Sequence, residues 1–399
     1  MPGPRWISQD ELAQRREEWS GLSVACDFPS AFSDPRWVSQ WWKHYGERHE
    51  PWSLALEDDA GSLRGLALLA LDASSVARTL TFAGGRWNGL DALLFAPAAE
   101  DELALALLAA LAERRTEWDL WRIARAPIGS SLADALLGGQ AGLRSSAHDV
   151  RLQPYVDLPA EIDVFESRFG GKRRTEFRRR WRRLQEAGAE MKLVSDPDEA
   201  PAAVARLLDL RRERAAAMGQ NQAQMDERFD RFITDVVRDM LPEGVRLWLL
   251  EMDGQLLTGK LNLVASWREH GYISAVSAEQ LSLSPGHSLE RQAIHAMIEE
   301  RRAEFDIGPG RDDYKYHWGA TDREVARMVV ASPTARGKLL GARAAFDLRL
   351  RNTAAAEALR RRKGVIPERA TAEHPARKGP ELAKAEPTAA ADGGASAQR

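Results

Sequence analysis

The sequence of 399 residues contains a single cysteine, Cys26, so neither an intrachain disulfide nor a cysteine-rich zinc site is expected. The formal net charge at pH 7 is only −3, which indicates no overall attraction to DNA or to an anionic membrane. The longest apolar stretch, Leu103–Leu111, is too short to span a bilayer. The N-terminal residues lack the apolar core of a secretory signal. We therefore expect a cytoplasmic protein.

The motifs of several enzyme classes are also missing. His287 and His295 do not have the spacing of a zinc-binding pair on one helix, and no carboxylate ligand accompanies them at ordinary spacing. The sequence has neither a GxSxG nucleophile elbow nor a phosphate-binding GKS loop. We therefore expect no metal cofactor and no serine nucleophile.

Length and composition predict a globular protein with two domains. A chain of this length exceeds what one hydrophobic core usually fills, and the hydrophobic fraction of 44% is ordinary. Residues 57–71 and 251–265 share one pattern, in which an acidic, glycine-containing turn joins two strands. Helices and strands follow in a similar order in the two halves, which favours a repeated α/β architecture.

The most informative stretch is 284–318. Pro285 and Gly286 open a helix with apolar residues at helical spacing. The unpaired N–H groups and partial positive charge of a first helical turn suit a phosphate or pyrophosphate. A short strand with Asp306 at its centre follows, and then a glycine-rich loop that leads to Lys315 among aromatic residues. This concentration of titratable groups predicts a functional site.

The order SPG–helix–FDIGPG–YK–W in this stretch resembles the C-terminal signature of the GNAT-type acetyltransferases of the cellulose-biosynthesis-associated (CelD/BcsL) family. That family is related to the Fem peptidoglycan aminoacyltransferases. The likeness extends upstream to Lys172-Arg173-Arg174 and Gly188, and covers roughly residues 1–330. It implies an α/β (α+β) fold of tandem GNAT-like domains, with mixed, mostly antiparallel sheets flanked by helices.

The resemblance also implies an activity. We expect an acyltransferase that uses acetyl-CoA or another acyl-CoA as donor and modifies a sugar or an amine in polysaccharide or cell-envelope biosynthesis. A peripheral association with the envelope-synthesis machinery is left open.

The expected domain order follows from the resemblance and from shifts in composition. We expect an N-terminal GNAT-like domain over 1–155, a basic linker helix over 156–190 and the C-terminal acyltransferase domain over 191–331. A basic helix over 332–363 and a disordered tail over 364–399 complete the chain, since the tail has almost nothing to bury.

The expected donor-binding and catalytic groups belong to the stretch 284–318. Asp306 is a candidate base or substrate-positioning carboxylate, with a loop anchor as the alternative. Lys315 is a candidate for neutralising a phosphate or an oxyanion, with a surface lysine as the alternative. His287 either relays a proton or caps its helix. The candidate donor-binding residues are Ser284, Gly286, His287 and Ser288.

Residues 168–183 form the most basic segment, with nine Lys or Arg. Phe177, Trp181 and Leu184 recur at helical spacing and predict one apolar edge that docks on the body. The basic face is either a solvated connector or a wall for an anionic substrate; a nucleic-acid helix is disfavoured by the overall charge. Two tyrosines are added to these basic residues: Tyr272, at the start of an expected strand, and Tyr314, beside Lys315. The candidate substrate-binding residues are therefore Lys172, Arg174, Arg178, Tyr272 and Tyr314.

Two other functions remain open at this point. One is Fem-like transfer of an aminoacyl group from tRNA, in which the basic helix would meet the RNA backbone. The other is a catalytically degenerate transferase fold that acts as a scaffold in an envelope-assembly complex.

Overall fold

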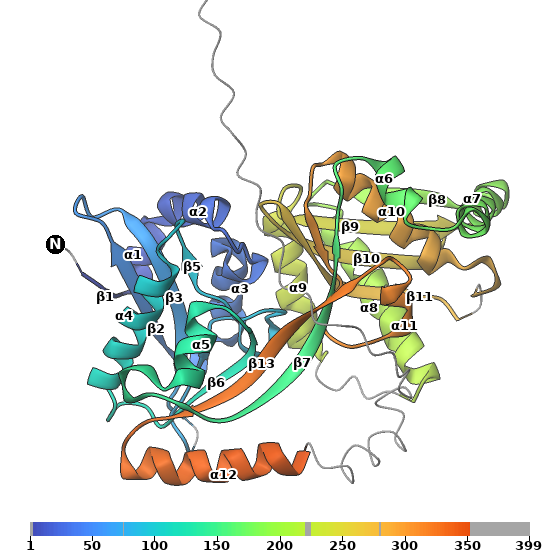
Figure 1. Ribbon diagram of the computed structural model, residues 1–399. Helices are drawn as coiled ribbons and strands as arrows, with labels where there is room; N and C mark the ends of the chain where they lie inside the picture. The colour runs from blue at the N-terminus through green and yellow to red at the C-terminus, as the bar shows by residue number, and fades with distance from the viewer. Residues whose placement is uncertain (1–2, 75, 220–224, 279–280, 352–399) are drawn as a thin grey trace, which may run out of the picture. The chain divides into compact units, whose positions relative to one another are not determined.

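A mixed sheet of thirteen strands runs through the protein (Figure 1). The computed structural model describes residues 3–74, 76–219, 225–278 and 281–351. Within these residues most neighbouring strands are antiparallel, and β4–β6 and β11–β12 are the two parallel pairs. Helices cover the sheet on both sides, so the predicted α/β fold class is confirmed.

The strand order repeats once. Outward from the centre, the N-terminal half has β6 parallel to β4, followed by the antiparallel strands β3, β2 and β1. The C-terminal half has β12 parallel to β11, followed by the antiparallel strands β10, β9 and β8. The strands of the two halves are β1 (Arg5–Ile7), β2 (His49–Glu57), β3 (Leu63–Asp72), β4 (Thr79–Phe82), β6 (Leu120–Pro127), β8 (Glu190–Val194), β9 (Val245–Met252), β10 (Gln255–Ala265), β11 (Arg268–Val276) and β12 (Glu304–Asp306), with the short β5 (Leu94–Phe95) beside β3.

Two long strands exchange between the halves at the centre of the sheet. Strand β7 (Ser145–Asp157) follows the N-terminal half in sequence but pairs with β12 of the C-terminal half. Strand β13 (Thr321–Ala331) follows the C-terminal half but pairs with β6 of the N-terminal half. They also pair with each other along most of their length (Figure 1). The sequence suggested the repeat but neither of these strands.

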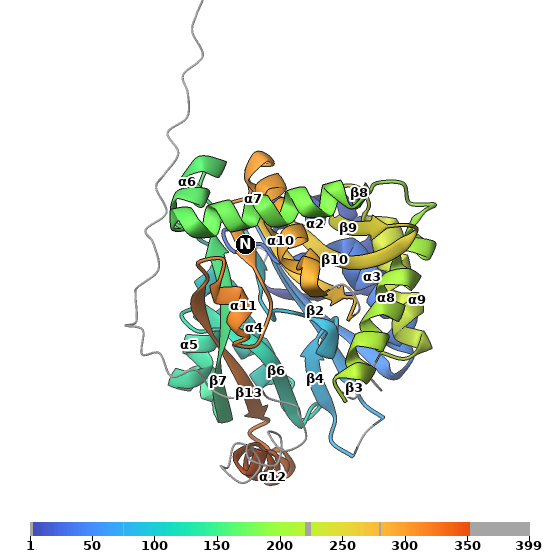
Figure 2. The ribbon, with the colours of Figure 1, turned by 90° about the vertical axis from the view of Figure 1, so that its right-hand side faces the viewer.

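The helices divide between the two faces of each half. In the C-terminal half, α8 and α9 pack on one side, whereas α10, α6 and α7 lie on the other, with α7 running across the top of Figure 2. The helices are α1 (Gln9–Gln14), α2 (Arg16–Ala25), α3 (Pro35–Tyr45), α4 (Glu100–Glu113), α5 (Ser131–Gly138), α6 (Ile162–Ser167), α7 (Gly171–Glu186), α8 (Ala200–Ala217), α9 (Glu227–Met240), α10 (Pro285–Glu299), α11 (Asp313–Tyr316) and α12 (Ala335–Arg351). Among the helices described, none is both long enough and apolar enough to cross a bilayer.

The start of α3 shows how local sequence fixes a helix that contacts β11. The Asp34 carboxylate accepts a hydrogen bond from the Arg36 N–H at 2.8 Å, and Pro35 occupies the first helical position. Trp37 and Trp41, which lie one turn apart on this helix, are buried and belong to the hydrophobic core. The Trp37 ring meets Tyr272 of β11 edge-on at 5.4 Å, which ties the N-terminal half to the C-terminal half.

The C-terminal part of the chain is described only as far as Arg351. Helix α12 packs against β7 and β13 over the first part of the expected basic helix. The rest of that expected helix and the expected disordered tail over 364–399 lie outside the described residues.

Candidate functional site

The candidate site lies where β11 and β12 part. The two strands pair in parallel only as far as His270 and Asp306. The chain after Asp306 stays with β7, through a hydrogen bond from the Ile307 N–H to the Pro154 carbonyl at 3.1 Å, whereas β11 stays with β10. In the described structure no strand pairs with that side of β11 beyond His270. A free strand edge of this kind is suited to bind the backbone-like amides of an extended ligand.

Two glycines allow the strands to approach closely at this point. Gly308 has a φ of +83°, and a Cβ atom there would lie 3.1 Å from the Gly271 carbonyl oxygen. A side chain at residue 308 would therefore be strained and would crowd β11. This steric limit explains why residue 308, in the loop after Asp306, is a glycine.

A cavity of about 200 Å³ opens at this point, with walls from both halves of the protein. Its C-terminal wall includes His270, Tyr272, Asp306 and Arg211. Its N-terminal wall includes the segment 86–89. The other lining residues are Phe32, Arg125, Gln153, Met225, Phe229, Gly271, Ile273, Gly308 and Pro309. We call this the His270 cavity.

His270 is the most suitable proton acceptor in the cavity. The residue is only 3% exposed, and its Nδ1 lies 3.6 Å from the Oδ2 of Asp306. Its Nε2 has no hydrogen-bond partner among the described residues. The imidazole lies 5.3 Å from the Phe32 ring, which limits its rotation. A histidine held on one side by a carboxylate and free on the other has the arrangement of a general base.

Asp306 is held as an anion. Its carboxylate accepts hydrogen bonds from the Gln153 amide at 2.7 Å and from the Gly308 N–H at 2.8 Å. Burial raises the pKa of Asp306, but the contact with His270, the charge of Arg323 and the Gly308 N–H outweigh burial and lower this pKa to about 2. An acid of this strength is a poor proton acceptor at neutral pH. Its contact with His270 suggests a role that the sequence did not predict, namely orienting that imidazole. Its bond from the Gly308 N–H fits the expected loop anchor, and the expected role toward the substrate stays a prediction.

Lys315 lies beside the cavity and is 3% exposed. Its ammonium group donates to the carbonyl oxygens of Gly308 at 3.0 Å, Pro309 at 2.7 Å and Gly310 at 3.0 Å. All three N–H donors of the ammonium are accounted for by these contacts. Lys315 therefore holds the loop that follows Asp306, and its expected electrostatic role in transfer stays a prediction.

The start of α10 lies at the far end of the free edge of β11. A Cβ atom on Gly286 would lie 2.7 Å from Cγ2 of Val276, so glycine permits this close approach. Ser284 precedes α10 in a left-handed conformation and gives no side-chain cap to its first N–H groups. His287 and Ser288 instead face α7, beside Phe177 and Trp181. Burial, followed by the charge of His317, lowers the pKa of His287.

The predicted substrate-binding residues divide into two groups. Tyr272 lines the His270 cavity, and its hydroxyl donates to the Trp87 carbonyl at 3.1 Å. Tyr314 is 39% exposed on α11 and does not line that cavity. Lys172, Arg174 and Arg178 lie on α7, outside the cavity. Their substrate-binding role stays a prediction.

The apolar edge expected on α7 is confirmed. Phe177 and Leu184 are buried, and Trp181 is half-buried. The Phe177 ring stacks on Trp318 at 5.3 Å. This contact explains the aromatic residue that ends the stretch 284–318: it anchors α7 to the body.

Sequence reasoning missed most of the cavity wall. His270, Arg211 and Gln153 come from three different elements, and no local pattern joins them. A signal for His270 did exist. The strand that ends at Asp306 follows a helix, and a strand–helix–strand connection predicts that its two strands pair in parallel. The strand before that helix has His270 just before a glycine.

The corresponding position in the N-terminal half is filled. Beyond the β4–β6 pairing, the loop after β4 places Asp91 against β6. The Asp91 carboxylate accepts from the N–H groups of Ala124 and Arg125, and its own N–H donates to the Arg125 carbonyl. This pairing leaves the N-terminal half without the open strand edge that β11 has in the C-terminal half.

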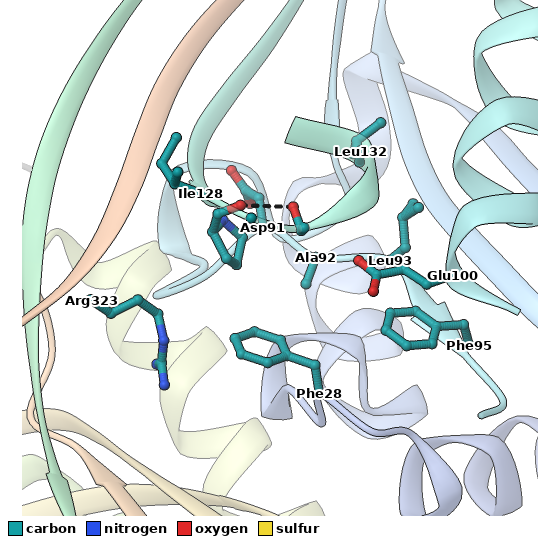
Figure 3. Close-up of a pocket in the computed structure, with 12 residues that line it drawn as sticks. Phe28, Asp91, Ala92, Leu93, Phe95, Glu100, Ile128, Leu132 and Arg323 are labelled. Carbon is teal, nitrogen blue, oxygen red and sulfur yellow. Dashed lines mark hydrogen bonds between the residues drawn. The ribbon is translucent and has the colours of Figure 1, made fainter. Parts of the chain in front are cut away.

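A second cavity, of about 170 Å³, lies behind this loop (Figure 3). Phe28, Phe95 and Leu132 form apolar walls, and Glu100 and Arg323 supply charge. Burial raises the pKa of Glu100. Because Arg323 is paired with Glu304 at 2.6 Å, this cavity offers fewer free polar groups than the His270 cavity.

Comparisons with known proteins identify the part of the chain that is similar to a known domain. The family model described as an acetyltransferase (GNAT) domain matches residues 171–316, which contain β11, α10, β12 and α11. No curated protein sequence matches the chain significantly. The residues that match therefore form a GNAT-type acetyltransferase domain, and they make up less than half of the chain.

Solved structures support the fold of nearly the whole described chain. A crystal structure of FemX matches with a TM-score of 0.61 at 13% identity, over 82% of this chain and 97% of that chain. The C-terminal domain of an Agrobacterium fabrum protein assigned as a lysylphosphatidylglycerol synthetase matches with a TM-score of 0.52 at 13% identity, over 82% of this chain and 94% of that chain. At these identities the similarity establishes the fold and leaves donor and acceptor open.

Proposed function

We propose that this protein, which contains a GNAT-type acetyltransferase domain, transfers an acyl group from an acyl-CoA donor to the amine or hydroxyl of a sugar or amine acceptor. The observation that carries the proposal is the unpartnered Nε2 of His270 at the point where β11 and β12 part. The expected CelD/BcsL relationship, and with it a place in polysaccharide or envelope biosynthesis, is part of the proposal. It rests on the resemblance of residues 284–318.

The residues along β11 fit an extended donor. The free edge runs from Tyr272 to Val276, and Gly286 brings the start of α10 to its end. The neighbouring strand β10 has no such free edge, because Leu261–Val264 is paired on both sides. From His270 to Val276 the strand extends about 20 Å, so a pantetheine arm along β11 would bring its phosphates to the first N–H groups of α10.

The donor supplies a thioester, which is already activated toward nucleophiles. His270 takes the proton from the acceptor's amine or hydroxyl as the new bond to the acyl carbon forms. The carbon–sulfur bond then breaks, and the sulfur leaves as the thiol with the proton that His270 returns. Asp306 keeps the imidazole oriented and stabilises its protonated form, as an anionic neighbour does. No covalent acyl-enzyme is required, which is consistent with the burial of Cys26 away from the cavity.

The test is the pH dependence of transfer by His270→Gln. We expect kcat to fall by about 10²–10⁴-fold, the usual contribution of a general base, with loss of the acidic limb of the pH–rate profile. Asp306→Asn should lower kcat without unfolding the protein. His148→Gln, on an exposed position of β7, serves as the matched control. A wild-type kcat and pH profile for His270→Gln would overturn the assignment.

The exposed face of α7 favours one alternative, Fem-like transfer from aminoacyl-tRNA. Arg178 and Arg182 are exposed, and this face has several further arginines. If α7 binds tRNA, affinity will fall steeply as salt concentration rises, because phosphate contacts release counterions. A catalytically inactive scaffold is the other alternative. Absence of heat in calorimetry with acetyl-CoA, and no thermal shift with any acyl donor, would support it over the proposal.

A further inference from the structure

Three guanidinium groups line the His270 cavity without a carboxylate partner among the described residues. They belong to Arg86, Arg125 and Arg211. Of these, Arg86 is exposed, and Arg125 and Arg211 are half-buried. By contrast, the buried Arg268 is paired with Glu304 at 2.7 Å and the half-buried Arg246 with Glu300 at 2.6 Å. The difference sets the arginines of the cavity apart from those that stabilise the fold.

Neutral groups hold these arginines in place. Arg211 donates to the Ser274 carbonyl at 3.0 Å, and its buried Nε has no partner in the described structure. Burial lowers the pKa of Arg211, although arginine stays charged at neutral pH. Arg125 donates to the Asn88 carbonyl, and the Arg86 guanidinium lies 4.7 Å from the Trp87 ring centroid. Each side chain is oriented without an ion pair to a carboxylate within the described residues. The nearby Asp91 carboxylate interacts with the charge of Arg125 but forms no ion pair with its guanidinium.

Asp306 is the one carboxylate among the described residues that line the cavity. It does not balance these arginines, because the basic groups nearest to it are His270 at 3.6 Å and Arg323 at 3.7 Å. The cavity therefore carries a net positive charge. Leaving a buried charge without a counter-charge is unfavourable, and a bound anion would relieve this cost.

We infer that the acceptor carries an anionic group, a carboxylate or a phosphate, which binds Arg125 and Arg211 while its nucleophile lies at His270. The inference rests on the proposed function and names the class of its acceptor. Arg86 and Arg125 come from the N-terminal half, across the cavity from the free edge of β11 that suits the donor. Planar guanidinium groups bind carboxylate and phosphate through paired hydrogen bonds, which fixes the orientation of the acceptor.

The first test measures anion binding without any acyl donor. Inorganic phosphate and succinate are titrated into the full-length protein by calorimetry at constant ionic strength. We expect Arg125→Gln and Arg211→Gln each to weaken binding about tenfold or more, the effect of losing a hydrogen bond to a charged group. Arg125→Lys and Arg211→Lys should retain part of the affinity. The ratio of the phosphate affinity to the succinate affinity identifies the favoured anion.

The control is Arg122→Gln, which changes an exposed arginine on the same strand as Arg125. Thermal unfolding confirms that each variant is folded. If the wild-type protein binds neither anion, or if all variants bind as the wild type does, the inference is overturned.

A second measurement separates acceptor from donor. The affinity for acetyl-CoA should be nearly unchanged in Arg125→Gln, whose side chain comes from β6. Arg211→Gln is left out of this measurement, because Arg211 donates to the Ser274 carbonyl on the strand that suits the donor. If Arg125→Gln loses acetyl-CoA affinity instead, Arg125 serves the donor and the inference is overturned. If the wild-type protein binds the anions through these arginines but binds no acyl-CoA, the proposed function fails and the anion site remains.

Discussion

Lys315 illustrates how a conspicuous residue can have more than one role. Its ammonium group binds three successive carbonyl oxygens, from Gly308 to Gly310. Burial lowers the pKa of Lys315, and nearby Asp312 opposes that shift. The residue thus fixes the loop that leaves β12, next to the carboxylate that orients His270. A role in positioning and a role in transfer predict different results.

We expect Lys315→Met to lower the free energy of unfolding by about 1–3 kcal/mol, because buried carbonyl groups lose their donor. Activity should fall with it, since the loop no longer fixes Asp306. Chemical denaturation with parallel kinetics checks this result. If activity is abolished while stability stays at the wild-type value, Lys315 acts in the transfer step.

Glu269 gives a prediction about pH. Glu269 precedes His270 in the sequence and is fully buried. Its carboxyl group accepts a hydrogen bond from the Asn262 amide at 2.6 Å, and burial raises its pKa from 4.5 to about 7. A carboxyl group with a higher pKa in the folded state binds more protons when folded. The contribution of Glu269 to stability is therefore fully present below pH 4.5 and is lost as pH rises through about 7. The loss should be about 3 kcal/mol.

The measurement compares the free energy of unfolding at pH values between 4.5 and 7.5 in the wild type and in Glu269→Gln. The variant keeps the shape of the side chain and removes its titration, so this part of the pH dependence should disappear. An unchanged pH dependence in the variant would show that Glu269 is not its source.

Among the elements, α10 matters most because its start meets the end of β11. A Cβ atom at Gly286 would come within 2.7 Å of the Val276 side chain. Gly286→Ala should therefore displace the start of the helix from the free edge and raise the KM for acyl-CoA about tenfold or more, since small misplacements have large effects at such sites. Val276→Ala in the same chain should restore much of the affinity.

Gly21→Ala is a suitable control for this prediction, because a Cβ atom there has no neighbour within 4 Å. Steady-state kinetics with the donor varied is the measurement. An unchanged KM for acyl-CoA in Gly286→Ala would place the donor's phosphates elsewhere.

Helix α7 gives a second prediction at this scale. Its apolar edge is anchored through Phe177, whereas Arg178 and Arg182 are exposed. If this face forms part of the acceptor site, Arg178→Glu with Arg182→Glu should raise the KM for the acceptor and leave the unfolding temperature unchanged. An unmoved KM would show that α7 is a solvated connector.

Local sequence patterns predicted the elements better than their assembly. The hairpin between β2 and β3 and the helix–strand pair α10–β12 follow from residues close together in the chain. Strands β7 and β13 were not foreseen, because their pairing joins segments more than 150 residues apart. For the same reason the cavity was only partly predicted: Asp306 and Tyr272 belong to the conspicuous C-terminal half, whereas Arg125 contributes from β6.

At the scale of the whole molecule, the exchange of β7 and β13 makes the two halves depend on each other. Each half lacks its own central strand, and the expected domain boundary at residue 155 falls inside β7. The largest hydrophobic cluster also spans both halves, since it includes Trp37 of α3 and Phe232 of α9, whose rings lie 5.1 Å apart. A cut between the halves would expose strand edges and open this cluster.

We therefore expect residues 1–158 and 159–399, produced separately, not to unfold cooperatively, and the intact chain to unfold in a single calorimetric transition. The physical reason is that β6 and β12 would each lose a central neighbour, and buried aromatic surface would meet water. Co-expression of the two pieces should recover folded protein, because the missing strands are then present in trans. Two well-separated transitions in the intact chain, or an independently folded piece 159–399, would show that the halves are autonomous, and the N-terminal wall of the His270 cavity would then be free to move against β11.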